Sequence, residues 1–572
     1  MRETFVTHAL RVLPSLFGET PARESGSFIM VEGTPVGGVD ALVRLGPVLL
    51  LAVWACICIL ATTAQSEGRR KQSGQVWPWM LSFVGLMVAS AWQLVDVRYR
   101  TGAARLFGGT LVVDGFSRMG VFLVSLIGAL AMILGAGRCR LKNPLGTSCG
   151  PHVPGLLLLS LSGMSLALVV ADLLALVLCL EVSALPLIWL TGESSRSRDD
   201  TFRAYLSALF SASLLLWGAL LVQKTFGATD YGILAATTDA HMASPSLAIA
   251  VVLLVAAFAW KLSAVPFDLG WARTTAQAPS PVALLADGAM KVALALVGVR
   301  LFVTTLRHPV TSLGAGGWTS LMASLAAVTF VMAGTAVLWQ RRMVRITAQL
   351  SLLAAGWVLL GLVGMALSPD AKLATMGLVY LVVAHGLGLA GVLALSSWIE
   401  GHDRPRPGDK VGLSPHWKAL GAQHPFLAVV TCVVVADLLG FPLTMGFWAR
   451  LAVAEALLAG GSSTALLITV VAGWVTACLV LIRVVKALWF PRKKLKISLL
   501  SPEDPLAKGE LAGDDSAEPG GVTPAGEGGG LLLDESSSGA RLLRIVVGVS
   551  VLVVVAAGIW PEPFLQFFGR LS

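Results

Sequence analysis

The chain has 572 residues, of which 56% are hydrophobic and only 13% are charged, and its formal net charge is +9. Soluble globular chains carry about 25% charged residues, so this composition excludes an ordinary water-soluble domain. The basic residues are scattered over short segments between apolar runs, which argues against a nucleic-acid-binding face.

Apolar runs long enough to cross a bilayer, about 20 residues each, recur from Leu45 to Trp560. We predict about fourteen membrane-spanning segments, several of them interrupted by proline or glycine. Their expected bounds are 45–63, 77–95, 117–136, 154–170, 173–191, 201–223, 246–267, 281–305, 319–339, 346–367, 373–398, 425–459, 464–489 and 542–560. The sequence therefore predicts an all-α polytopic membrane protein.

These segments suggest a domain organisation. Residues 1–40 are an expected N-terminal extension, and residues 41–150 hold helices 1–3. The seventh and twelfth spans are predicted broken helices five segments apart, which indicates two inverted five-helix repeats at 151–310 and 311–490. Residues 491–541, rich in Gly, Pro, Ser and acids, are a predicted disordered cytoplasmic linker before the C-terminal helix at 542–572.

Lysine and arginine cluster in the loops after odd-numbered spans, as in 69–71, 138–142 and 492–496. The even-numbered loops are poorer in basic residues, apart from the second. The positive-inside rule therefore predicts cytoplasmic odd-numbered loops. Both termini would then lie on the periplasmic side of a bacterial inner (plasma) membrane.

No motif for a cofactor stands out. The seven cysteines form no CxxC pair and lie mostly in apolar runs, which is typical of small apolar filler rather than of a disulfide or an iron–sulfur ligand. There is no P-loop and no GxGxxG after a strand. We predict no metal and no cofactor site on this chain.

Ionisable side chains inside the apolar segments are the strongest functional signal. A charged side chain at mid-bilayer costs about 3 kcal/mol on insertion scales, so it is uncommon without a partner or a water path. Those here fall on separate spans, several beside a Pro or Gly interruption, so we predict a lateral row of groups that pass protons. The row consists of Glu181, Lys261, Lys291, His385 and Arg450.

Most of these charges also have a structural interpretation. Lys261 lies close enough to a helix end to snorkel to the headgroups. Lys291 follows Asp287 by one helical turn, as in a neutralised pair. Arg450 either pairs with Asp437 across the break in its helix or snorkels.

The remaining candidates are one histidine, two carboxylates and two prolines. The structural alternative to a proton-carrying role for His385 is that of a hydrogen-bonded core residue. Asp172 and Glu181 are nine residues apart, about 180° around a helix, so we expect no paired-carboxylate site and predict that Asp172 is an N-cap. Pro266 and Pro442 each remove a backbone donor. Irregular backbone survives in a membrane where it is buried in protein or lines water, so both breaks favour an ion path.

The quoted segments resemble a known family. DLLALVLCLEVSALPLIWL is similar to the fifth-helix motif of the antiporter-like subunits of respiratory complex I, and AFAWKLSAVPF to their FKxxxxPFHxW motif. The stretches 111–126, 278–302 and 341–362, with ADLLGFPLTMGFWARL, resemble further motifs in the same order. Within this superfamily, the number of helices and the basic residue in helix twelve resemble subunit N of the NADH–quinone oxidoreductase.

The resemblance implies a proton-conducting subunit of an enzyme that reduces quinone elsewhere in the complex. It implies a switching pair of Glu181 and Lys261, a central Lys291, and a far half-channel that Arg450 faces. Quinone, NADH, FMN and iron–sulfur clusters are then expected in other subunits. The expected partners are other membrane subunits, the lipid bilayer and protons, with no nucleic acid.

Two features depart from the family pattern. Asp268 stands where a histidine is usual, and a Pro-Asp pair after it is missing. Arg450 replaces a lysine, and arginine does not release its proton; terminal transfer would then fall to water, Asp437 or Glu455. A Mrp-type cation/proton antiporter subunit and a non-conducting structural subunit are the alternative functions.

Overall fold

A computed structural model describes residues 34–566, with gaps at 36–37, 67–75, 100–101, 141–149, 195–197, 242, 268–274, 308–312, 314–315, 341–342, 401–416, 418–419, 462–463, 491–536 and 565. Most of the expected N-terminal extension, most of the expected linker, and Asp268 therefore lie outside the described residues.

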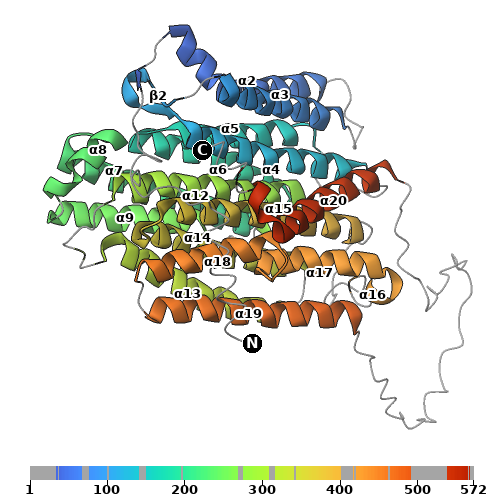
Figure 1. Ribbon diagram of the computed structural model, residues 1–572. Helices are drawn as coiled ribbons and strands as arrows, with labels where there is room; N and C mark the ends of the chain where they lie inside the picture. The colour runs from blue at the N-terminus through green and yellow to red at the C-terminus, as the bar shows by residue number, and fades with distance from the viewer. Residues whose placement is uncertain are drawn as a thin grey trace, which may run out of the picture.

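The described chain is a bundle of helices that lie side by side (Figure 1). In a bilayer a helix satisfies its own backbone hydrogen bonds, which is why such apolar segments take this form. The long helices are α2 Gly38–Ser66, α3 Trp77–Tyr99, α4 Gly115–Cys139, α5 Val153–Val169, α6 Leu173–Ser194, α7 Arg198–Phe226, α9 Pro245–Lys261, α13 Gly317–Trp339, α14 Met343–Leu367, α15 Ala371–Glu400, α17 Pro425–Leu439, α18 Met445–Ala459, α19 Thr464–Trp489 and α20 Ser538–Ile559.

One further run combines α-helical and π-helical turns between α9 and α13: α11 Ser280–Leu284, η4 Leu285–Ala289, α12 Met290–Gly298 and η5 Val299–Thr305. Short helical pieces complete the fold: η1 Phe107–Gly109, α8 Tyr231–Thr237, η3 Thr238–His241 and α16 Leu420–Gln423. The π-helical turns matter because such turns inside α-helices frequently occur at functional sites.

Within the described ranges, 11 helices are long and apolar enough to cross a membrane, and α5, α9 and α17 are shorter apolar helices. The prediction of a polytopic helical membrane fold is confirmed. Each expected span overlaps one of these elements, and the twelfth is divided into α17 and α18. The total of fourteen crossings and the two-repeat boundaries stay predictions.

A small sheet was not anticipated. Its order is β1 Thr34–Pro35, β2 Ala104–Leu106 and β3 Leu111–Val113, with β1 parallel and β3 antiparallel to β2. Gly108 and Gly109 both have positive φ in the turn between β2 and β3, where glycine costs least. The strands have only two or three residues, too few for an alternating pattern to be recognised in the sequence.

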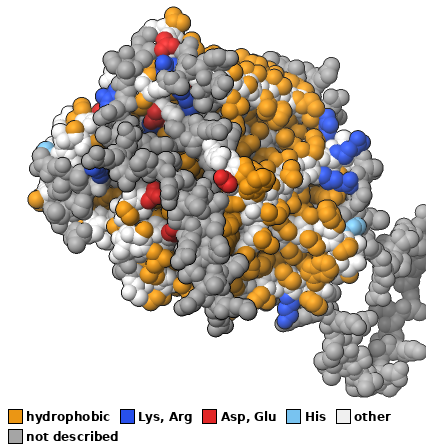
Figure 2. All heavy atoms as spheres, viewed as in Figure 1, with side chains coloured by type: hydrophobic (Ala, Val, Ile, Leu, Met, Phe, Trp, Pro, Cys, Tyr) orange, Lys and Arg blue, Asp and Glu red, His pale blue; other side chains and the backbone are white. Residues whose placement is uncertain are grey.

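Burial separates central helices from peripheral ones. In the run 280–305 and in α15, all residues of the most apolar stretch are buried, whereas in α7 and α19 only 28% of them are. Large exposed side chains recur on one stripe of α2, at Leu49, Val53, Ile57 and Leu60. Figure 2 shows a broad hydrophobic surface, with Lys and Arg side chains on either side of it. Such a surface suits lipid or neighbouring membrane helices, while the central helices carry the buried charges.

The cysteine prediction is wrong at one position. Cys139, the last residue of α4, is disulfide-bonded. It ends its helix rather than lying within an apolar run, so packing as apolar filler does not apply to it. Cys56, Cys58, Cys179, Cys432 and Cys478 are free.

Candidate functional site

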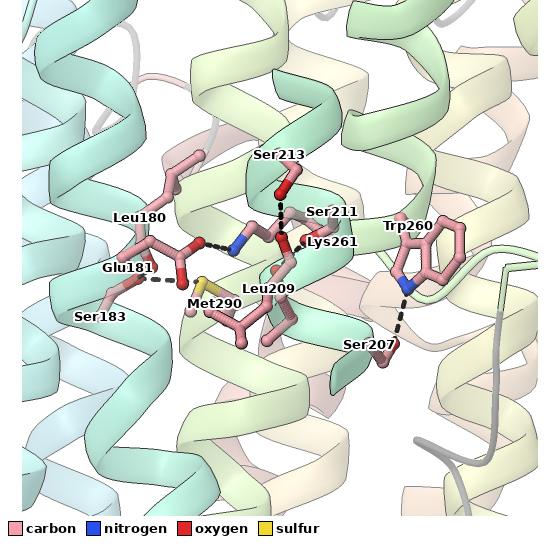
Figure 3. Close-up of polar contacts among 11 residues, drawn as sticks. Leu180, Glu181, Ser183, Ser207, Leu209, Ser211, Ser213, Trp260, Lys261 and Met290 are labelled. Atoms are coloured by element: carbon pink, nitrogen blue, oxygen red, sulfur yellow. Dashed lines mark hydrogen bonds and ion pairs between the residues drawn. The ribbon is translucent and has the colours of Figure 1, made fainter. Parts of the chain in front are cut away.

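Glu181 on α6 and Lys261 on α9 form an ion pair inside the bundle. The Lys261 amino group donates a hydrogen bond to Glu181 Oε1, and the two side chains are 7% and 18% exposed, respectively. Figure 3 shows the lysine extending toward the carboxylate. Lys261 therefore reaches inward to a partner and does not snorkel.

The surroundings of this pair are mainly apolar, and one carboxylate oxygen is left unengaged. Glu181 Oε2 makes no hydrogen bond to any described residue. Met290 of α12 lies beside it (Figure 3), and the Ser183 hydroxyl is 3.7 Å from Met290 Sδ. Trp260 points the other way and donates to Ser207 Oγ of α7 at 2.6 Å. Glu181 therefore holds Lys261 with one oxygen and keeps the other available as an acceptor.

Lys291, the residue after Met290 in α12, has two polar partners. Its Nζ lies 3.3 Å from Asp287 Oδ1 and donates to Ser351 Oγ of α14 at 2.5 Å. Lys291 is 3% exposed and Asp287 is 4% exposed. Asp287 belongs to the π-helical η4, so the pair forms across the junction of a π-helical and an α-helical turn. The predicted i,i+4 pair is present, with a serine hydroxyl as a second partner.

His385 lies near the middle of α15 and is buried. Its ring interacts with the main chain of Asp287, in the π-helical turn η4. Lys291 and Arg450 are both close enough to act electrostatically on the ring. Helix α15 packs against α12 on one side and against α17 and α18 on the other. His385 therefore lies near two cations and near the Asp287 main chain, and its role as a proton carrier stays a prediction.

Arg450 on α18 does not form the ion pair with Asp437 that the sequence suggested. Its guanidinium donates to main-chain carbonyls, to Leu438 O at 2.5 Å, Gly446 O at 3.0 Å and Asp437 O at 3.3 Å, and it lies over the Trp357 ring. The last carbonyls of a helix lack intrahelical donors and carry partial negative charge. Arg450 thus caps the end of α17 instead of pairing with the Asp437 carboxylate.

The break between α17 and α18 depends on glycine. Gly440 has φ +76°, and an added Cβ would lie 2.5 Å from Arg450 Nη1. A Cβ on Gly446 would lie 2.1 Å from Asp437 O. Pro442 lies within the break and has no N–H to donate. Asp437 Oδ1 accepts from Gly446 N at 2.8 Å, which caps the start of α18.

The two remaining candidates lie outside this row. Asp172 Oδ1 accepts from Ala175 N at 2.9 Å, and its other oxygen accepts from the Thr229 hydroxyl. The prediction that Asp172 caps a helix is confirmed. Helix α9 ends at Lys261, and Pro266 lies in the turn that follows it.

Sequence reasoning missed two buried ion pairs. Arg300 of η5 pairs with Asp114, the N-cap of α4, and Arg118 of α4 pairs with Asp96 of α3 at 3.3 Å. The signal that identified the other charges, an ionisable residue in an apolar run, was present at Arg300 and Arg118 too. Both pairs tie helices together at α4. Among the described residues, no group of three His, Cys, Asp or Glu side chains could hold a metal ion.

Comparison with known families adds to this geometry. A family model described as "NADH:quinone oxidoreductase/Mrp antiporter, TM" matches residues 170–476, which is more than half of the chain. The match covers Glu181, Lys261, Lys291, His385 and Arg450.

Curated relatives include proteins named NADH-quinone oxidoreductase subunit N. The one from Gemmatimonas aurantiaca is 32% identical over 66% of this chain and 68% of its own length. The one from Cutibacterium acnes is 27% identical over 92% of this chain and 94% of its own length.

Two solved complexes contain chains of similar fold. A chain of respiratory complex I from Thermus thermophilus superposes with a TM-score of 0.63 at 19% identity, covering 91% of this chain and 98% of that chain. A chain of the Mrp complex from Dietzia sp. superposes with a TM-score of 0.69 at 18% identity, covering 94% and 97%.

Proposed function

Since the chain belongs to the NADH:quinone oxidoreductase/Mrp antiporter transmembrane family, we propose that it is the proton-translocating subunit N of a complex I-type NADH–quinone oxidoreductase. It works as a membrane subunit assembled with other membrane subunits. The relatives named subunit N, which align over most of the chain, support this assignment.

The observation that carries the proposal is the buried row of charges on contacting elements. Lys261, Lys291, His385 and Arg450 lie on α9, α12, α15 and α18, and each of these helices packs against the next. Buried charges in membrane helices are costly and are characteristic of proton paths. The row therefore serves function more than it serves stability.

The first half of the mechanism uses Glu181 and Lys261. A charged Glu181 holds the Lys261 ammonium, and protonation of Glu181 releases it toward the neighbouring helix α12. A lysine in the interior can give up its proton, because burial disfavours its charged form. Movement of one charge across 100 mV costs about 2.3 kcal/mol, so quinone reduction must change the stability of this pair by a comparable amount.

The second step uses Lys291 and His385. The Asp287 carboxylate and the Ser351 hydroxyl both accept from the Lys291 amino group. His385 lies on the adjacent helix α15, within electrostatic reach of Lys291, and is the next group in the proposed path. The proposed path thus runs from Glu181 on α6 through α9 and α12 to α15, and on toward α18.

We further propose the location and the partners. The chain lies in a bacterial inner membrane with both termini on the periplasmic side, because the loops rich in Lys and Arg then face the cytoplasm. NADH, FMN, the iron–sulfur clusters and quinone bind to other subunits. This chain contributes proton movement alone.

The experiment is reconstitution of the intact complex into vesicles with Lys291→Ala. Quinone reduction and acidification should fall together, whereas Lys486→Ala, at an exposed position in the last turn of α19, should leave both unchanged. Unchanged proton pumping by Lys291→Ala would refute the proposal. Sodium-dependent proton exchange without quinone reduction would identify a Mrp-type antiporter instead.

A further inference from the structure

Asp437 is a buried carboxylate that the mechanism above does not use. It is 1% exposed, and only one of its oxygens is engaged: Oδ1 accepts from Gly446 N at 2.8 Å, whereas Oδ2 makes no hydrogen bond within the described part of the chain. Arg450 approaches the Asp437 main-chain carbonyl and forms no ion pair with its carboxylate in the described structure. A buried carboxylate oxygen without a donor is costly, so it needs a functional explanation.

The free oxygen of Asp437 faces α15. A Cβ built on Gly388 of that helix would lie 2.9 Å from Asp437 Oδ2 and 2.9 Å from the Leu438 side chain. Gly388 follows His385 by three residues, so both lie on neighbouring positions of one helix face. The absence of a side chain at Gly388 is what lets the carboxylate approach α15 on the turn next to the histidine.

The free Asp437 oxygen therefore approaches α15 at Gly388, about one helical turn from His385. Asp437 has one oxygen without a hydrogen-bond partner within the described residues, and the His385 ring interacts there with the Asp287 main chain and with no side-chain hydrogen-bond partner. Buried polar groups of this kind in membrane proteins typically bind water or line an ion pathway. Both groups exchange a proton readily, whereas the nearby arginine does not.

We propose that Asp437 carries the proton in the half of the molecule formed by α14 to α18, receiving it from His385 past Gly388, and that Arg450 is a fixed cap. This inference rests on the proposed proton-translocating function. In the transfer, the imidazolium of His385 loses one proton to become neutral imidazole, and the Asp437 carboxylate gains it to become a carboxylic acid. The positive and negative charges cancel, so the His385 and Asp437 side chains are both neutral after the transfer.

Arg450 has a positioning role in this account. Its guanidinium donates to the main-chain carbonyls of Asp437, Leu438 and Gly446. These hydrogen bonds stabilise the irregular backbone between α17 and α18, next to the Asp437 carboxylate. The Arg450 charge also favours the ionised form of the Asp437 side chain once the proton has moved on. A lysine at this position would be able to carry the proton itself; with arginine, that task passes to the neighbouring acid.

The main test is Asp437→Asn in the intact, reconstituted complex. The amide oxygen can still accept from Gly446 N, so the cap is kept while the titratable group is lost. We expect coupled quinone reduction to fall by about tenfold or more, because a positioned proton-transferring group typically contributes about a hundredfold or more to a rate. Asp437→Glu should restore a substantial part of the activity. Wild-type pumping by a correctly assembled Asp437→Asn complex overturns the inference.

Infrared difference spectroscopy provides a readout that a purely structural role would not affect. The carbonyl stretching band of a protonated carboxylic acid should appear on a pH step in the wild type, shift in Asp437→Glu and vanish in Asp437→Asn. If Asp437→Asn fails to assemble, the wild type and Asp437→Glu decide the question. A band that does not shift in Asp437→Glu overturns the inference.

A pair of glycine substitutions tests the path. Gly388→Ala crowds Asp437 Oδ2, and Gly391→Ala is the matched control on the same helix, where an added Cβ would meet Val434 at 2.9 Å instead. We expect Gly388→Ala alone to lower coupled activity severalfold. Equal effects of the two variants would contradict a path past Gly388. If Lys291→Ala is also silent, the proposed function fails rather than this inference alone.

Discussion

Asp437 and Arg450 close the break between α17 and α18 from opposite sides. The Asp437 carboxylate accepts from Gly446 N at the start of α18, and the Arg450 guanidinium donates to Asp437 O and Leu438 O at the end of α17. An acid thus caps the positive end of one half-helix and a cation caps the negative end of the other. This arrangement, the Glu181–Lys261 pair and the contacts of Lys291 lead to four predictions.

Glu181→Gln should leave Lys261 without its counter-charge. Removing one partner of a buried ion pair costs about 3–5 kcal/mol, so Lys261 would release its proton or turn away, and coupled quinone reduction should fall sharply. The measurement is turnover and acidification by the reconstituted complex. Glu193→Gln on the same helix is the control, because Glu193 pairs with His152 at a half-exposed site. Full activity of Glu181→Gln would favour the non-conducting structural alternative.

Ser351→Ala should weaken the hold on Lys291 without removing its charge. The lost hydrogen bond to a charged group is worth about 1.5–3 kcal/mol, which corresponds to about a tenfold or greater change in a rate that depends on that bond. We expect altered turnover with normal assembly. A rate equal to that of the wild type would mean that Ser351 does not tune Lys291.

Arg450→Gln should destabilise the subunit. It removes charge-assisted hydrogen bonds to three main-chain carbonyls, each worth about 1.5–3 kcal/mol. The expected result is a lower unfolding temperature of the purified complex and poor assembly. Arg450→Lys should recover only part of the loss, because a compact ammonium cannot reach three carbonyls in the geometry of a guanidinium. A wild-type unfolding temperature for Arg450→Gln would contradict the capping role.

Gly440→Ala should be destabilising by about 1–3 kcal/mol, because a non-glycine residue is strained in the left-handed region. Its Cβ would also meet Arg450 Nη1 at 2.5 Å. Gly548→Ala in α20 is the matched control: nothing lies within 4 Å of its added Cβ, so alanine should be neutral or stabilising there. Thermal unfolding of the two variants gives the comparison, and equal stabilities would contradict the strain argument.

Much of the candidate site could be predicted from the sequence, because an ionisable residue in an apolar run is conspicuous. Glu181, Lys261 and Lys291 were found this way, and the spacing of Asp287 and Lys291 predicted their contact. The partner of Lys261 lies 80 residues away on another helix, which local spacing does not encode. Motif resemblance alone suggested that pair.

Other features left no such signal. Arg450 binds carbonyl oxygens, and main-chain acceptors do not appear in a pattern of side chains. Ser351 is one serine among many in apolar helices, so its contact with Lys291 was not foreseeable. The small sheet was missed because its strands are two or three residues long. In each case tertiary packing, rather than local sequence, selects the partner.

The central claim is that the buried charges move protons, and the most direct measurement is the number of protons translocated per quinone reduced by the vesicle-reconstituted complex with Lys261→Ala. Loss of the Lys261 ammonium leaves Glu181 without the cation that it holds. The account predicts a clear fall in both this ratio and the turnover, with the Lys486→Ala complex unchanged. A Lys261→Ala complex that assembles normally and pumps as many protons per quinone as the wild type would contradict it.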